Sequence, residues 1–407
     1  MTHPRTHPCP PTPSAWCIRV RSFVEASSQT LALEFNLRTV SCTISSAFPT
    51  PEGVAEAVSL AKRAGLKASE GVVIGIGSGA AIDLARAVSA SLFHDADSVD
   101  SERDCRDGVA GGSTILAPCT LGGLWATSVA DGSLLLDTKE EALLPSSSRR
   151  GSGDVVIMDS SSLALPPLYA PFPPATRGGY SPAPSMAHFA AAGLAVVLDV
   201  ARVEGMVADQ SGRALSHVAR ELEAAAASFA AVLTLAAEAN NGSEVASDHA
   251  QSQRLLDAMC RVSALVEPAS HPASTTVPQT LAHALLPAHF PQYHIVTYMG
   301  SILPGLCEAL AADSGPTTSI NNVAEVILKG DRHEDSLSSW ASRVAAQAGI
   351  PPMASLAFCA PAVETLADRL NSYGHLIASS NSGKSSALRR HDCSAFANEV
   401  LERSLNR

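Results

Sequence analysis

The segment GVVIGIGSGAAIDLARAVSA, residues 71–90, constrains the fold more than any other part of the chain. A run of β-branched residues ends in the glycines Gly75, Gly77 and Gly79, and a helical pattern of apolar residues follows at once. This order predicts a buried strand, a tight turn and a helix whose backbone N–H groups and dipole can hold a phosphate. The alternative is a plain strand-turn-helix connection that binds nothing.

Short strand-like segments alternate with helical ones around this turn. Residues 50–65 read as a helix that begins at Pro51, after an N-cap at Thr50, and stops at Gly65. The alternation predicts a parallel sheet covered by helices on both faces. Three further segments read as strands from their apolar runs: 39–46, 113–120 and 154–159.

The second half of the chain has a different pattern. From about residue 180 onward it consists of alanine-rich helical stretches without strand signals. A stretch rich in Pro, Gly and Ser, residues 166–185, contains the boundary, and 240–253 and 379–392 read as polar loops. The predicted organisation has three parts: a disordered or targeting segment 1–38, an α/β dinucleotide-binding domain 39–175 and an all-helical domain 176–407.

Composition excludes several classes of function. Hydrophobic residues make up 46% and charged residues 16%, which indicates a globular chain with a large core. The net charge is −11 without a basic cluster, so we expect no nucleic-acid partner. No run of about 18 apolar residues occurs, so we expect no membrane span. Nine cysteines without a CxxC pair favour a reducing compartment: the cytoplasm, or an organelle if the Arg- and Ser-containing N-terminus is a transit peptide.

The glycine turn allows two interpretations. Gly75, Gly77 and Ala80 formally fit a dinucleotide fingerprint, which needs an acid at the end of a second strand about 20 residues on. The acids near that distance fall in the solvated loop 94–108, so a conventional Rossmann unit is poorly supported. In the second reading, residues 77–79 make the turn, the helix dipole faces a pyrophosphate, and Asp83 lies in the first helical turn.

The order of motifs resembles the iron-containing (group III) alcohol dehydrogenase family, which includes maleylacetate reductases and is related to dehydroquinate synthases. Residues 77–80 stand at the positions of its GGGSxxDxAK loop, where Asp83 matches and Arg86 replaces the lysine. The resemblance covers roughly residues 40–407. Further similar segments follow in order: ILAPCTLGG (115–123, with Pro118 and Thr120), DVVIMDSSSLALPP (154–167), SMAHFAAA (with His188), LAHAL (281–285), YHIVTYMGSILP (293–304) and GIPPMASLAFCA.

The resemblance implies an α/β nucleotide-binding domain with a parallel sheet, followed by an all-α domain. It also implies an NAD- or NADP-dependent oxidoreductase that transfers hydride between a small alcohol and an aldehyde or keto substrate. The family's metal, often iron or zinc, is held by one Asp and three His, and polarises the oxygen. By resemblance, His188 and His294 match metal ligands, and His283 matches a catalytic histidine near the substrate. The cofactor residues implied are Gly77, Ser78, Gly79, Ala80, Asp83 and Thr120.

The chain departs from the family at the metal site. Pro184 stands where the family has the Asp ligand, and Gln279 stands where it has a His. Two imidazoles without a carboxylate lack the charge and the ligand number that hold a divalent ion. Trp125, near the expected nicotinamide, would either stack on the ring or fill its pocket.

Three hypotheses follow from these departures. The first is a metal-light enzyme like maleylacetate reductase, with His283 or His294 as proton donor, because imidazole titrates in the right range. The second is a metal-dependent alcohol dehydrogenase with substituted ligands. The third is a non-catalytic descendant that keeps the fold. The alanine-rich helices are compatible with a homodimer.

Overall fold

The structure is a computed structural model of the 407-residue chain. The residues that it describes are 34, 39–42, 44, 49–66, 71–93, 113–128, 134–137, 142–145, 154–158, 184–211, 216–240, 248–266, 276–279, 281–282, 294–312, 318–329, 336–356 and 386–406.

The first long helix, α2 (Pro51–Arg63), begins and ends as local signals predict. The Thr50 hydroxyl accepts a hydrogen bond from the Gly53 N–H at 3.1 Å and so caps the first turn. Gly65 ends the helix with φ of 80°, a conformation that glycine adopts without steric cost. The predicted strand at 39–46 is wrong for its described residues, 39–42 and 44, which have no regular structure.

A small parallel sheet contains β1 (Val72–Gly77), β2 (Ser113–Pro118) and β5 (Asp154–Val156), in the order β1-β2-β5. Its three strands match the predicted ones, and α3 (Gly79–Phe93) follows β1 directly. Helix α3 covers one face, where Leu116 is fully buried and Gly75 lies so close to Ala85 that a Cβ on the glycine would come within 2.6 Å.

The opposite face of the sheet differs from the prediction. Ile74, Ile115 and Val155 are register partners on this face, and Ile74 and Val155 are 42% and 53% exposed. The prediction that helices cover both faces therefore holds for one face of the described sheet.

Three elements of the first half, one helix and two strands, had no sequence signal strong enough to predict them. Helix α5 (Leu121–Ser128) follows β2 after a turn of two residues. Strands β3 (Leu134–Asp137) and β4 (Ala142–Pro145) form an antiparallel hairpin. The Leu136 N–H donates to the Pro49 carbonyl at 2.8 Å, so the hairpin is fixed to the chain just before α2.

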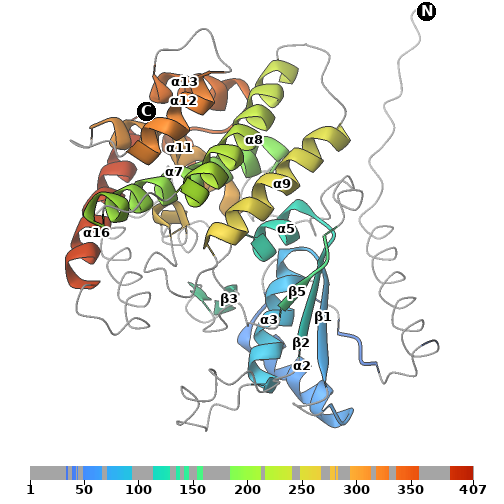
Figure 1. The fold of residues 1–407 in the computed structure, drawn as a ribbon. Coiled ribbons are helices and arrows are strands. Elements are labelled where there is room, and N and C mark those ends of the chain that lie inside the picture. Colours follow the sequence, from blue (N-terminus) through green and yellow to red (C-terminus); the bar gives the residue numbers. More distant parts are fainter. Residues whose placement is uncertain are drawn as a thin grey trace, which may run out of the picture.

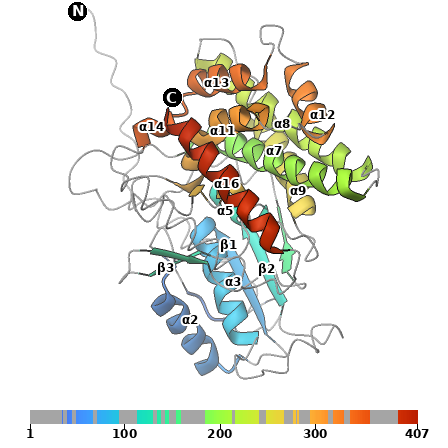
Figure 2. The ribbon, with the colours of Figure 1, turned by 90° about the vertical axis from the view of Figure 1, so that its left-hand side faces the viewer.

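The described part of the second half is entirely helical, as predicted. Helix α11 is central and packs against α7, α13 and α16, while α5 contacts α7 and α9 and so joins the bundle to the α/β part (Figures 1 and 2). Two predicted loops are too long, because α9 already begins at Asp248 and α16 at Ser386. The helices are α7 (Met186–Ser211), α8 (Ser216–Asn240), α9 (Asp248–Val266), α11 (Ile295–Ala312), α12 (Thr318–Leu328), α13 (Leu337–Gln347), α14 (Met353–Leu356) and α16 (Ser386–Leu405).

Two helical stretches, His217–Ala239 in α8 and Ile295–Ala312 in α11, are apolar and long enough to cross a bilayer. Both pack against other helices of the bundle, α8 against α7 and α9, and α11 against α7, α13 and α16. The apolar window of α11 is 78% buried, as expected for a helix at the centre of a large core, whereas that of α8 is 44% buried.

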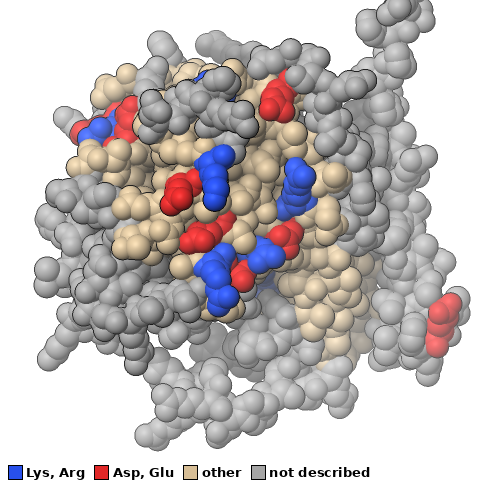
Figure 3. Space-filling model, turned by 45° about the horizontal axis from the view of Figure 1, so that its top comes forward, with Lys and Arg blue, Asp and Glu red and all other residues tan. Residues whose placement is uncertain are grey.

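Acidic and basic side chains are interspersed on the helical face shown in Figure 3. Arg261, for example, pairs with Glu221 at 2.7 Å and with Asp257 at 3.0 Å. Such partly exposed pairs add little stability, about 1 kcal/mol or less each.

Candidate functional site

The glycine turn lies at the carboxyl end of β1. Gly77 has φ of 133°, which an L side chain rarely adopts, and the Ser78 carbonyl accepts the Ala81 and Ile82 N–H groups at 3.0 and 3.1 Å. Gly79 is therefore the first residue of α3. The Cys119 N–H donates to the Gly77 carbonyl at 3.0 Å, which fixes the turn to the end of β2.

A second helix starts beside this turn. The Thr120 hydroxyl accepts the Gly123 N–H at 3.1 Å and caps α5. A Cβ on Gly79 would lie 3.1 Å from the Gly122 carbonyl oxygen, so glycine allows the two helices to approach this closely. The first N–H groups of α3 and α5 have no acceptor within their own helices and carry partial positive charge. Two helix N-termini side by side at the ends of parallel strands form an arrangement that suits a phosphate.

Two polar residues of α3 lie away from the turn. Asp83 is 6% exposed and lies in the second turn of the helix, so its predicted place in the first turn is wrong. The Arg86 guanidinium donates to the carbonyls of Ala126 and, at 3.4 Å, Thr127, near the carboxyl end of α5. Arg86 therefore caps α5 and fixes it against α3. Ala80 is buried under the turn.

His188 lies in the first turn of α7. Its Nδ1 accepts the backbone N–H of Ser185 at 3.2 Å and lies 2.9 Å from the Ser185 hydroxyl. The His188 side chain thus caps the start of the helix, as the second side chain of a capping box does. Burial lowers the pKa of His188, so the neutral imidazole is favoured.

His294 immediately precedes α11. Its Nδ1 accepts the Val296 N–H at 3.3 Å, so the imidazole caps this helix too. Burial, with a smaller effect of nearby His188, lowers the pKa of His294 to about 4. At neutral pH the ring is therefore uncharged, which does not favour the predicted role of His294 as a general acid.

The Nε2 atom of His294 faces the start of α5. A Cβ on Gly122 would lie 3.5 Å from His294 Nε2, 3.8 Å from Thr120 Oγ1 and 4.0 Å from the Gly79 nitrogen. We call these four residues, Gly79, Thr120, Gly122 and His294, the junction. It brings together residues from the predicted cofactor set and one predicted metal ligand. No sequence signal pointed to Gly122, because its role depends on the approach of α11.

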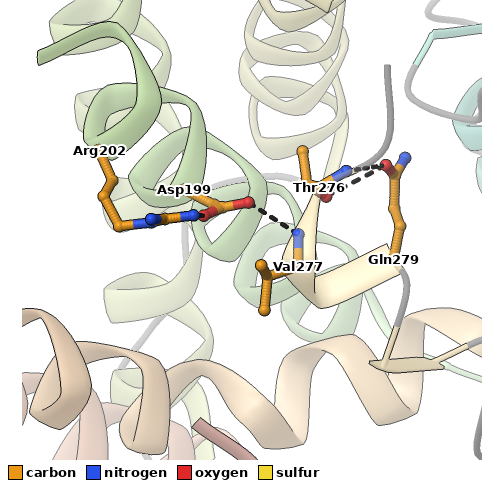
Figure 4. A network of polar contacts seen from close by, with 5 residues as sticks. All are labelled: Asp199, Arg202, Thr276, Val277 and Gln279. Atoms are coloured by element: carbon orange, nitrogen blue, oxygen red, sulfur yellow. Dashed lines mark hydrogen bonds and ion pairs between the residues drawn. The ribbon is translucent and has the colours of Figure 1, made fainter. Parts of the chain in front are cut away.

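Gln279, at the position of the absent histidine ligand, has a local structural role. It is 3% exposed, and its Oε1 lies 3.0 Å from the Thr276 nitrogen, which donates to it, and 3.1 Å from the Thr276 hydroxyl. The Asp199 Oδ2 accepts the Val277 N–H at 2.7 Å, and its Oδ1 accepts Arg202 Nε at 3.0 Å (Figure 4). Asp199 and Gln279 thus hold the segment 276–279 in place.

The residues that the structure describes do not fit the family's metal. Among the described residues, no group of three or more His, Cys, Asp or Glu side chains could hold an ion. Pro184 is buried and offers no ligand atom to replace the carboxylate. The predicted catalytic residue His283 lies outside the described residues.

Trp125 fills space in the core. It is 3% exposed, and its ring centroid lies 6.2 Å from that of Phe189, which in turn lies 5.7 Å from the His294 ring. Of the two roles open to Trp125, the structure favours filling space between α5 and α7. The row of three rings supports one side of the junction.

The fold has known relatives, although no protein-family model and no curated sequence matches the chain. An iron-containing alcohol dehydrogenase from Thermococcus thioreducens superposes with a TM-score of 0.58 at 13% identity, over 96% of this chain and 90% of that one. Maleylacetate reductase from Rhizobium sp. strain MTP-10005 gives 0.54 at 13% identity, over 90% and 81%. An iron-containing alcohol dehydrogenase from Thermotoga maritima gives 0.51 at 15% identity, over 89% and 82%. The chain has the fold of the iron-containing alcohol dehydrogenases, and the resemblance seen in the sequence is confirmed at that level.

Proposed function

We propose that the chain is an NAD(P)-dependent oxidoreductase that transfers hydride between the nicotinamide and the C–O carbon of a small alcohol, aldehyde or ketone. The observation that carries this proposal is the close approach of Gly79 to the Gly122 carbonyl, which brings two helix N-termini together at the ends of β1 and β2. The names of the structural relatives, alcohol dehydrogenase and maleylacetate reductase, support the same class of reaction.

In this proposal the pyrophosphate of the dinucleotide binds to the backbone N–H groups of residues 77–80, and the dipoles of α3 and α5 stabilise its charge. The turn can come so close to a ligand because Gly77 and Gly79 carry no side chain. Thr120 lies beside this site, while Asp83 is buried in the second turn of α3. Three points stay predictions from the sequence: that the cofactor is NAD or NADP, that the chain forms a homodimer, and that it is located in the cytoplasm or an organelle.

The chemistry needs a hydrogen-bond donor at the substrate oxygen. When hydride leaves the reduced nicotinamide and bonds to the carbonyl carbon, the π electron pair moves to oxygen, which then needs stabilisation and a proton. The metal of the family would supply that stabilisation, but the described residues do not fit it, so no step is assigned to a metal here. Among the described polar side chains of the helical half, that of His294 reaches the junction.

A second candidate function is nucleotide binding without turnover. The tight packing of Trp125 against Phe189 and the local role of Gln279 favour it, because both positions serve the core in this chain. This protein would bind NAD(P)H with the same turn and would show no reaction with alcohols or carbonyl compounds.

Fluorescence titration of the full chain with NADH and NADPH tests both candidates. We expect saturable binding of at least one nucleotide below the millimolar range. Gly79→Asp places a carboxylate against the phosphate and should weaken binding by about tenfold or more, or about 1.4 kcal/mol. Gly53→Ala in α2 is the matched control, because its Cβ would meet the Thr50 hydroxyl at an ordinary 3.4 Å.

No binding of either nucleotide at millimolar concentration would refute both candidates. Unchanged binding by Gly79→Asp would show that the phosphate lies elsewhere. Turnover with a panel of alcohols, aldehydes and keto acids would then distinguish the oxidoreductase from the non-catalytic protein.

A further inference from the structure

The backbone hydrogen bonds of His188 and His294 favour the tautomer that carries its proton on Nε2. In each ring, Nδ1 accepts a backbone N–H, from Ser185 at 3.2 Å and from Val296 at 3.3 Å. A backbone N–H can only donate, so each Nδ1 must present its lone pair. In a neutral imidazole the single proton is then on Nε2.

This tautomer is the reverse of the one that a metal-binding histidine needs. A histidine that ligates through Nε2 keeps its proton on Nδ1 and donates it to a carbonyl or a carboxylate. If His188 or His294 ligated through Nε2, the proton would move to Nδ1 and face a backbone N–H. Each ring would lose its helix-capping hydrogen bond and place two donors against each other.

The Nε2 atom of His294 is directed at the start of α5, close to the glycine turn. It is 3.5 Å from the position that a Cβ on Gly122 would take, and the nitrogen of Gly79 lies 4.0 Å from the same point. The nearby groups include the Gly79 N–H at the start of α3 and the Thr120 hydroxyl, which can donate, and the Gly122 carbonyl, which accepts. The two donors suit an oxygen that carries negative charge.

We propose that His188 and His294 are a pair of Nε2–H donors that do not ligate a metal, and that His294 donates to the oxygen of a carbonyl or alcohol substrate. The second part rests on the proposed oxidoreductase function, whereas the first does not. In the reduction, hydride bonds to the carbonyl carbon and the π pair moves to oxygen. The oxygen accepts the hydrogen bond from His294 and takes its proton from water, while His294 stays neutral.

The tautomers are measured by long-range ¹H–¹⁵N correlation spectroscopy on the ¹⁵N-histidine-labelled full chain at neutral pH. Signals are assigned by their loss in His188→Gln and His294→Gln, with His217→Gln as a control for an exposed histidine on α8. We expect a protonated Nε2 and an unprotonated Nδ1 in both rings. A proton on Nδ1 in either ring would overturn the proposal.

Metal retention is an independent measurement. The full chain is incubated with Zn²⁺ or Fe²⁺, passed through a desalting column and analysed for metal. We expect the chain to retain well below one ion. If an ion is retained, we expect the variants His188→Gln and His294→Gln to retain it as well. One ion per chain that is lost in both variants would overturn the proposal.

Two replacements of His294 test the donor role where turnover is found. Glutamine keeps an N–H donor, whereas aspartate offers acceptors and is a good ligand for a divalent ion. If His294 donates to the substrate oxygen, His294→Gln retains more activity than His294→Asp, and chelation by EDTA has no effect. Equal or higher activity of His294→Asp would overturn the donor role. Failure of nucleotide binding would overturn the proposed function and leave the tautomer assignment to be judged by the spectra.

Discussion

Removal of the Asp199 carboxylate should destabilise the helical half more than any surface substitution. Asp199 is 2% exposed and holds two partners: Arg202, whose guanidinium lies 2.9 Å away, and the Val277 N–H at 2.7 Å. Arg202 is itself 4% exposed and lies over the Phe396 ring, with its guanidinium carbon 4.1 Å from the centroid. Thus one carboxylate connects α7 to the segment 276–279 (Figure 4). Its partner Arg202 in turn connects α7 to α16 through Phe396.

The magnitude follows from the burial of these groups. Breaking a buried ion pair by removal of one partner costs about 3–5 kcal/mol, because the remaining charge loses its counter-ion without regaining water. A hydrogen bond to a charged group adds about 1.5–3 kcal/mol when it is counted alone. The two contributions share one carboxylate and are not additive, so we expect Asp199→Ala to cost about 4 kcal/mol of unfolding free energy.

The assay is urea unfolding followed by circular dichroism at the helical band, with the free energy extrapolated to water. Asp199→Asn keeps an oxygen that can accept the Val277 N–H and should cost less than Asp199→Ala. Glu399→Ala is the control, because the Glu399–Arg403 pair on α16 is 36–41% exposed and is worth about 1 kcal/mol or less. A cost of Asp199→Ala as small as that of the control would refute the reasoning.

Two further predictions concern the junction and its surroundings. Gly123→Ala should destabilise the chain by about 1–3 kcal/mol in urea unfolding, since its Cβ would strike the carbonyl oxygen of Gly77; stability equal to that of Gly53→Ala would contradict the close approach. His294, with a folded pKa of about 4, should lose stability as pH falls from about 6.5 toward 4, because the unfolded state takes up the proton first. At about pH 5 the loss relative to neutral pH should be about 2 kcal/mol, and His294→Gln should remove this part of the dependence; an unchanged pH profile in that variant would show that His294 is not its source.

Local signals predicted those elements whose ends are determined by their own neighbours. Thr50 caps α2 with the N–H three residues later, and Gly65 ends the same helix through its own backbone conformation. The predicted strand at residues 39–46 is absent from the described part of that segment. A strand needs a partner strand, and the local sequence cannot show whether one is present. Helix α5 has eight residues and was missed because its amphipathic pattern is too short to read.

The order of motifs singled out His188 and His294 as site residues. Both lie at helix starts, and His294 lies near the glycine turn. Their Nδ1 hydrogen bonds could not be predicted, since they depend on the angle at which the chain enters α7 and α11. The role of Gly122 was missed for the same reason, because it is defined by an approach of residues from α3 and α11.

The sequence by itself determined local conformation: which glycines turn, which residues cap, and that an α/β half precedes a helical one. Those features depend on interactions over three or four residues, which the order of amino acids specifies directly. Tertiary structure alone decided that Asp199 supports a segment 78 residues further along the chain, and that the His294 imidazole turns its Nε2 toward Gly122. These choices depend on how separate helices pack, because burial and the available hydrogen-bond donors around a polar atom exist only once the core has formed.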